Sequence, residues 1–168
     1  MRPFTMERLP LLAALLIVGG CSAATGSRSA AFERDVGVGS QSDVVEQVRI
    51  TMQKYQFQIQ QRSEAPPLFW ETQWRARAPF PDEQELGVSN AQVRLLIRAR
   101  ERTTASTLGP VLAVRVTVEN RVQMLGSDSW DQTLVTDTFR EWAAELAQDL
   151  RTRLDVGIRV FDPPPCCT

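Results

Sequence analysis

The sequence predicts an α+β fold, an antiparallel sheet of about four strands with two helices packed on one face, in the order helix, four strands, helix. Residues 44–55 and 139–154 repeat apolar residues at steps of three and four, which is typical of amphipathic helices. Four segments between them alternate apolar and polar residues, which indicates strands with one buried side. Short connections favour antiparallel neighbours, and both helices need one sheet face to cover, so the other face should be open.

The first helix should begin at Ser42 or Asp43, either of which can accept the free amide hydrogens of a helix start. Its apolar side is formed by Val44, Val45, Val48, Met52 and Tyr55. From Tyr55 the period changes to two, and Phe57 and Ile59 alternate with glutamines as in a strand. The strand should end before Pro66-Pro67, because proline has no amide donor.

Three further strands follow, each with an inner and an outer row of side chains. The expected inner rows are Leu68, Trp70, Thr72, Trp74 and Ala76, then Ala91, Val93, Leu95, Ile97 and Ala99, then Leu112, Val114, Val116 and Val118. The corresponding outer rows are Glu71, Gln73, Arg75 and Arg77, then Gln92, Arg94, Arg98, Arg100 and Arg102, then Arg115, Thr117 and Glu119. Residues 79–90 are expected to form a loop.

The second helix should be capped by Thr136 or Asp137 and stop near Gly157, since glycine commonly follows the last helical residue. Its apolar stripe consists of Phe139, Trp142, Ala143, Leu146, Leu150 and Leu154. Residues 158–161 could add a short edge strand.

The first twenty residues have the layout of a secretory signal. Arg2 and Arg8 precede an apolar stretch over residues 9–18, and two glycines then lead into Cys21. An apolar run of roughly ten residues is too short to cross a bilayer, which needs about twenty. Residues 18–21, Val-Gly-Gly-Cys, resemble the bacterial lipobox, which implies that diacylglycerol is attached to Cys21 and that the chain is cut before it. The alternative is an ordinary signal peptide cut near a cysteine.

Lipid on Cys21 would hold the mature protein to a membrane, because several acyl chains give stable anchoring. Ser22 differs from the aspartate that retains Gram-negative lipoproteins in the inner membrane, so the outer membrane, with the domain facing the periplasm, is expected. The expected organisation is a signal peptide (1–20), a lipidated flexible tether (21–42), a single α+β domain (43–161) and a disordered tail (162–168).

Composition excludes several classes of function. The chain has 168 residues, a formal net charge of −1 and no histidine, which removes histidine-based triads, metal sites and proton shuttles. The balanced charge gives no case for nucleic acid as a partner. Cys166 and Cys167 are adjacent and cannot form an ordinary disulfide with each other, so a tail without a role is expected over an intermolecular bridge or a metal site.

The helix, the strand after it and the segment Phe69-Trp70-Glu71-Thr72-Gln73-Trp74 resemble the helix-grip domains of outer-membrane lipoproteins, such as the BamC-type accessory subunit of the β-barrel assembly machinery. The resemblance rests on Trp70, Thr72 and Trp74 and covers about residues 42–155. It implies an accessory role in an envelope complex and brings no catalytic residues.

Arginines dominate the predicted open face. Strand parity places on it Arg75, Arg77, Arg94, Arg98, Arg100, Arg102 and Arg115. Guanidinium groups can grip phosphate or carboxylate with two hydrogen bonds, so this face is a candidate for binding an anion or an acidic partner. The alternative is a solvated face whose arginines pair with Glu71 and Glu119 across strands.

The tryptophans and acidic residues give weaker signals. Trp70, Trp74 and Trp142 are expected in the core, although they could line a ligand pocket. Trp130 stands in a polar loop and is a candidate anchor for a partner, or a lid on the core. The acidic residues Asp82, Glu83 and Glu85 are expected to be solvated rather than to hold calcium.

No enzyme signature, metal site or cofactor site is evident, so two functions are carried forward. The first is a non-enzymatic, membrane-anchored adaptor or accessory subunit that binds an envelope protein through the open face or through Trp130. The second is a carrier of a small apolar ligand or lipid, with a pocket between the helices and the sheet.

Overall fold

The computed structural model describes residues 31–63, 65–102 and 111–159. The predicted signal peptide, Cys21, the start of the tether and the tail over residues 162–168 lie outside the described residues. The strands are β1 (Ala31–Gly39), β2 (Ile59–Ser63), β3 (Leu68–Thr72), β4 (Arg75–Arg77), β5 (Val88–Glu101), β6 (Leu112–Met124) and β7 (Trp130–Asp131). The helices are α1 (Gln41–Lys54), α2 (Pro81–Glu85) and α3 (Asp137–Arg159).

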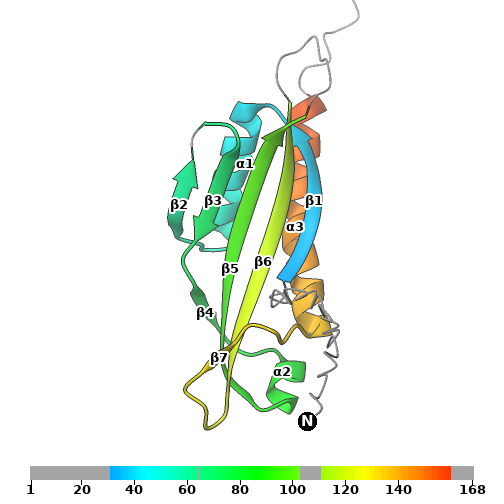
Figure 1. Cartoon of the computed structure of the whole chain (residues 1–168). Helices are drawn as coiled ribbons and strands as arrows, with labels where there is room; N and C mark the ends of the chain where they lie inside the picture. Colours follow the sequence, from blue (N-terminus) through cyan, green and yellow to red (C-terminus); the bar gives the residue numbers. More distant parts are fainter. Residues whose placement is uncertain (1–30, 64, 103–110, 160–168) are drawn as a thin grey trace, which may run out of the picture.

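All the strands belong to one antiparallel sheet, in the order β1-β6-β5-β3-β2 (Figure 1). The long strands β5 and β6 form its centre, and β4 and β7 extend it by pairing with β5 and β6 respectively. The chain is therefore α+β, but the predicted sheet of about four strands with two helices packed on one face is wrong. Seven strands and three helices are present in the described part of the chain.

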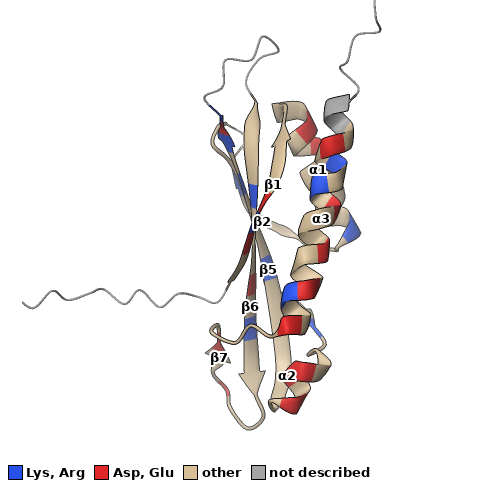
Figure 2. Ribbon diagram, turned by 90° about the vertical axis from the view of Figure 1, so that its right-hand side faces the viewer, with Lys and Arg blue, Asp and Glu red and all other residues tan. Residues whose placement is uncertain are grey.

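The hydrophobic core lies between the sheet and the helices. Figure 2 shows the sheet edge-on, with α1, α2 and α3 on the same side of it. The expected inner rows of β5 and β6 are confirmed, since their residues are all buried, Ala91 in a small separate cluster with Val88 and Val122 and the others in this core. The buried side of α3 is formed by Phe139, Ala143, Leu146, Ala147, Leu150 and Leu154, which is close to the predicted stripe. Val45 departs from the prediction for α1, because its side chain is 43% exposed.

The predicted flexible tether over residues 21–42 includes residues 31–39, which form strand β1 instead. This strand pairs with β6 from Ala31 opposite Glu119 to Gly39 opposite Leu112, and Val36 is fully buried in the core. The chain packs closely where it turns into α1, because a Cβ at Gly39 would lie 3.2 Å from the side chain of Val44, which would have to shift to admit a larger residue. The sequence of this segment is rich in small and polar residues and has no regular apolar alternation, so it did not predict a strand. Pairing with β6 stabilises β1 instead.

The predicted strand over residues 68–77 is interrupted by a β-bulge between β3 and β4. After the bulge, the side chains point to the opposite face of the sheet from the one predicted. Glu71 pairs with Leu96 and Arg75 pairs with Val93, so β3 and β4 contain one residue more than the matching stretch of β5. The Thr72 hydroxyl accepts a hydrogen bond from the Leu95 amide at 2.9 Å at this break. One extra residue moves every later side chain to the opposite face. Arg75 and Arg77 therefore lie on the helix side of the sheet.

Two predictions near the ends of elements are also corrected. Helix α2 occupies part of residues 79–90, which were expected to form a loop. Helix α3 continues through Gly157 to Arg159, so it does not stop at the glycine, and residues 158 and 159 are helical rather than part of an edge strand. Residues 160 and 161 lie outside the described residues.

Candidate functional site

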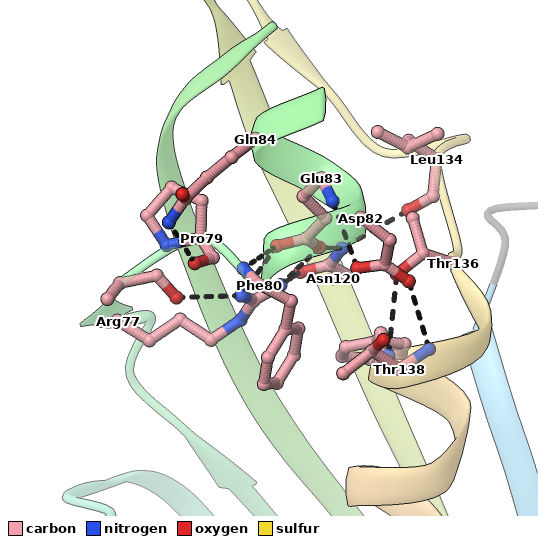
Figure 3. Close-up of polar contacts among 12 residues, drawn as sticks. Arg77, Pro79, Phe80, Asp82, Glu83, Gln84, Asn120, Leu134, Thr136 and Thr138 are labelled. Carbon is pink, nitrogen blue, oxygen red and sulfur yellow. Dashed lines mark hydrogen bonds and ion pairs between the residues drawn. The ribbon is translucent and has the colours of Figure 1, made fainter. Parts of the chain in front are cut away.

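A buried ion pair lies beneath α2, at one end of the sheet (Figure 3). Arg77 of β4 donates to both carboxylate oxygens of Glu83, at 2.7 and 2.5 Å, and also to the side-chain oxygen of Asn120 at 2.9 Å. The two charged side chains are 8% and 0% exposed. Glu83 also accepts a hydrogen bond from the Phe80 amide at 2.8 Å. These contacts tie α2 to β4 and β6.

Aromatic rings and a second carboxylate complete this cluster. The Arg77 guanidinium lies 4.2 Å from the centre of the Phe80 ring and 5.7 Å from that of Phe139. Asp82 accepts a hydrogen bond from the Thr138 amide at 3.0 Å in the first turn of α3. Burial raises the pKa of Asp82, but hydrogen bonds, the largest from Thr138, outweigh that effect and lower the pKa overall. Because its charges are paired within the fold, the cluster acts as a structural joint.

The opposite side of the sheet faces away from the helices of the described chain (Figure 2). We call this surface the open face. Strand register and side-chain contacts place on it Asp35, Phe69, Glu71, Trp74, Asn90, Gln92, Arg94, Leu96, Arg98, Arg100, Arg115, Thr117, Glu119, Arg121, Gln123 and Trp130.

The centre of the open face is electrostatically balanced. Arg94 pairs with Glu71 at 2.6 Å and with Glu119 at 2.5 Å. These are the cross-strand pairs that the alternative interpretation of the arginine face expected. One guanidinium between two carboxylates has no unpaired positive charge to offer a ligand, so the centre is not an anion site.

Towards β7, the open face carries an arginine clamped between two tryptophans. The Arg121 guanidinium lies 4.3 Å from the centre of the Trp74 ring and 4.8 Å from that of Trp130. Its Nε donates to Gln92 at 2.8 Å, and no carboxylate within the described residues pairs with it. Burial, followed by the charge of Arg94, lowers the pKa of Arg121. The side chain thus has contacts with two rings and a glutamine, and no carboxylate of the described chain compensates its charge.

At the other end of the open face, arginines lie close together on β5 and β6. Arg98 is directly opposite Arg115 and stacks at 5.6 Å on the Phe69 ring, while Arg100 is opposite Ala113. Arg115 pairs with Asp35 at 2.7 Å. The hydrogen bond from Arg115 is the main cause that lowers the pKa of Asp35.

The predicted site residues therefore divide into two groups. Arg94, Arg98, Arg100, Arg115 and Trp130 lie on the open face. Arg75 and Arg77 do not, and their assignment to that face is wrong because of the bulge before β4. Arg75 instead stacks at 4.9 Å on the Phe57 ring, and burial, followed by the charge of Arg77, lowers its pKa.

Three residues of these clusters have places that were not predicted from the sequence. Arg121 has the parity of Arg115 and Glu119, but the alternation was followed only to residue 119, whereas β6 continues to Met124. Trp74 was expected in the core and lies on the open face, because it follows the break after Thr72. Glu83 was expected to be solvated and is fully buried. Arg77 is only six residues from Glu83, but its predicted place on the open face separated the two, and the other partner, Asn120, lies 37 residues away.

The described residues contain neither a metal-binding cluster nor a membrane-spanning helix. No group of three or more cysteine, aspartate or glutamate side chains there could hold a metal ion. Among the same residues, no helix is long and apolar enough to span a membrane. No protein-family model matches the sequence, and comparison with curated proteins finds no relative.

Proposed function

We propose that the chain is a lipoprotein, anchored to the outer membrane through lipid on Cys21, that serves as a non-enzymatic adaptor in the periplasm. Its open face would bind an envelope protein, in an accessory role of the kind implied by the resemblance to BamC-type subunits. Anchoring rests on the lipobox-like residues 18–21. Docking rests on Arg121, held between Trp74 and Trp130 on a face that the described helices leave uncovered.

This arrangement has the composition of a protein interface. Tryptophan and arginine are enriched among the residues that carry most of the binding energy. The two indole rings restrict the movement of Arg121, so less conformational entropy is lost when a partner binds. The partner should present a carboxylate here, because Arg121 has none among the described residues and a guanidinium binds carboxylates strongly.

The alternative carrier function has less support. The described side chains between the helices and the sheet form a continuous buried core. A hollow of about 680 Å³ lies outside that core, between the end of α1 and α3, and polar side chains such as Lys54, Glu145 and Asp149 line it. An apolar ligand would find few matching contacts there. These observations favour the adaptor.

Combining Arg121→Ala with Trp130→Ala should abolish partner binding without unfolding the domain. Truncation of a residue that dominates an interface costs about 2 kcal/mol or more, which is about a thirtyfold loss of affinity for each residue and, if the two effects add, about a thousandfold loss for both. The measurement is the yield of partner crosslinked to the membrane-bound chain in intact cells, identified by mass spectrometry.

The matched control is Arg140→Ala, since Arg140 is an exposed arginine on α3. Its crosslinked yield should equal that of the unaltered chain, and thermal unfolding should show that all variants remain folded. An undiminished crosslink in the double variant would refute docking through the Arg121 clamp.

A further inference from the structure

The end of the open face near Arg100 carries three arginines, Arg98, Arg100 and Arg115, and among the described carboxylates only Asp35 forms an ion pair with one of them. One row across the sheet runs from Phe69 on β3 through Arg98 and Arg115 to Asp35 on β1. Asp35 takes both of its hydrogen bonds from Arg115, at 2.7 and 3.0 Å. Arg98 and Arg100 have no carboxylate partner in the described part of the chain.

This placement brings like charges together, although Asp35 offsets the charge of Arg115. Like charges directly opposite each other on neighbouring strands are destabilising, and Arg98 and Arg115 are such a pair. Arg98 and Arg100 are also adjacent on the same face of β5, because side chains two residues apart point to the same side of a strand. An anion bound between these guanidinium groups would relieve the repulsion.

The surface here is hollowed in two places that share Arg98 and Arg100. The first hollow, of about 210 Å³, is also lined by Asp35, Ala113 and Arg115. It exists because the small side chain of Ala113 lies directly opposite Arg100. The second hollow, of about 300 Å³, is lined by Pro67, Leu68 and Phe69 on the other side of the two arginines. The side chain of Leu68 is buried in the core, so Phe69 and Pro67 supply the apolar side chains of this second hollow, next to the two arginines.

We propose that these hollows bind an acidic peptide segment, with a carboxylate held by Arg98 and Arg100 and a neighbouring apolar side chain against Phe69. The segment would belong to the partner, so this inference rests on the proposed adaptor function. A guanidinium and a carboxylate match in geometry and can form two parallel hydrogen bonds. The second hollow explains why the ligand should carry an apolar group next to its acid.

A peptide carboxylate fits this pair of hollows better than inorganic phosphate does. Charge alone does not choose between them, because the phosphate charge of about −1.5 to −2 at neutral pH increases both its repulsion from Asp35 and its attraction to Arg98 and Arg100. The second hollow makes the difference, since an apolar side chain next to the carboxylate can contact Phe69 there, whereas inorganic phosphate has no such group.

The test measures binding of a fluorescent, end-blocked Ser-Gly-Glu-Leu-Gly-Ser peptide to the full chain in detergent micelles, by anisotropy at low salt. Replacing both arginines, by Arg98→Gln and Arg100→Gln, should weaken binding by about tenfold or more, because charge-assisted hydrogen bonds are lost. Replacing the peptide's glutamate by glutamine, or its leucine by glycine, should also weaken binding. The variant Arg140→Gln on α3 should bind the original peptide normally.

The inference is overturned if the double variant binds the peptide as tightly as the unaltered chain, or if the glutamine peptide binds as well as the acidic one. Displacement by inorganic phosphate, with no preference for the leucine-containing peptide, would also overturn it in favour of a simple oxyanion site. A failed peptide test beside an intact Arg121-dependent crosslink removes only this site. Loss of that crosslink is a separate result that concerns the adaptor function itself.

Discussion

Replacing Glu83 by glutamine is expected to lower the free energy of unfolding by about 3–5 kcal/mol, because it leaves the buried guanidinium of Arg77 without a counter-charge. The two side chains share two short hydrogen bonds, and the neighbouring rings of Phe80 and Phe139 exclude water from Arg77. Urea denaturation of the unaltered chain and the variant measures the difference directly.

The matched control for Glu83→Gln is Glu85→Gln, since Glu85 is an exposed residue of the same helix. It should change the free energy of unfolding by less than about 0.5 kcal/mol. The double variant Arg77→Met with Glu83→Leu should be more stable than Glu83→Gln alone, because apolar side chains of similar volume can replace a buried ion pair. A loss of less than about 1 kcal/mol in Glu83→Gln would show that the pair is not essential to the joint beneath α2.

Replacing Cys21 by alanine is expected to move the whole protein from the membrane fraction to the soluble fraction. Each buried CH₂ group of an acyl chain contributes about 0.8 kcal/mol, so two or more chains hold a protein stably, and the alanine variant lacks them. Membrane fractionation and intact mass measure the effect, and the unaltered mature chain should begin at Cys21 and carry acyl mass.

Joint substitution of the C-terminal cysteines, Cys166→Ala with Cys167→Ala, is the control for the Cys21 experiment. This variant should keep both the acyl mass and the membrane association, because only the lipobox-like segment leads into a cysteine suited to lipidation. An unaltered chain found soluble and without acyl mass would overturn the anchor and its location together.

The central strands and the long helices could be predicted because their patterns are local and regular. The alternation from Ala91 to Ala99 and from Leu112 to Val118 identifies the buried rows of β5 and β6 correctly. The stripe from Phe139 to Leu154 likewise identifies the buried side of α3. In these elements burial follows sequence spacing, because each strand or helix has one side against the core.

The other elements depend on partners that are distant in the sequence. Strand β1 is stabilised by its pairing with β6, about eighty residues away, and contributes few buried side chains of its own. The bulge after Thr72 depends on register with β5, so a parity argument carried across it assigns Trp74, Arg75 and Arg77 to the wrong faces.

For the candidate site, the sequence predicted which face most of the residues occupy, but not which residues they contact. Parity placed Arg94, Arg98, Arg100 and Arg115 on one face, and composition identified Trp130 as a residue of interest. The structure is needed to distinguish these residues by their contacts. Two carboxylates neutralise Arg94, whereas Arg121, which was not predicted, lies between two tryptophans. Those contacts join different strands, and strand parity does not specify them.

The most direct test of an adaptor that works through its open face is photocrosslinking of the lipidated chain in intact cells. A photoreactive residue would replace either Asn90, which is exposed on the open face, or Glu145, which is exposed on α3. A partner crosslinked from position 90 and not from position 145 is the expected result. Crosslinking from position 145 alone, or from neither position, would contradict the account.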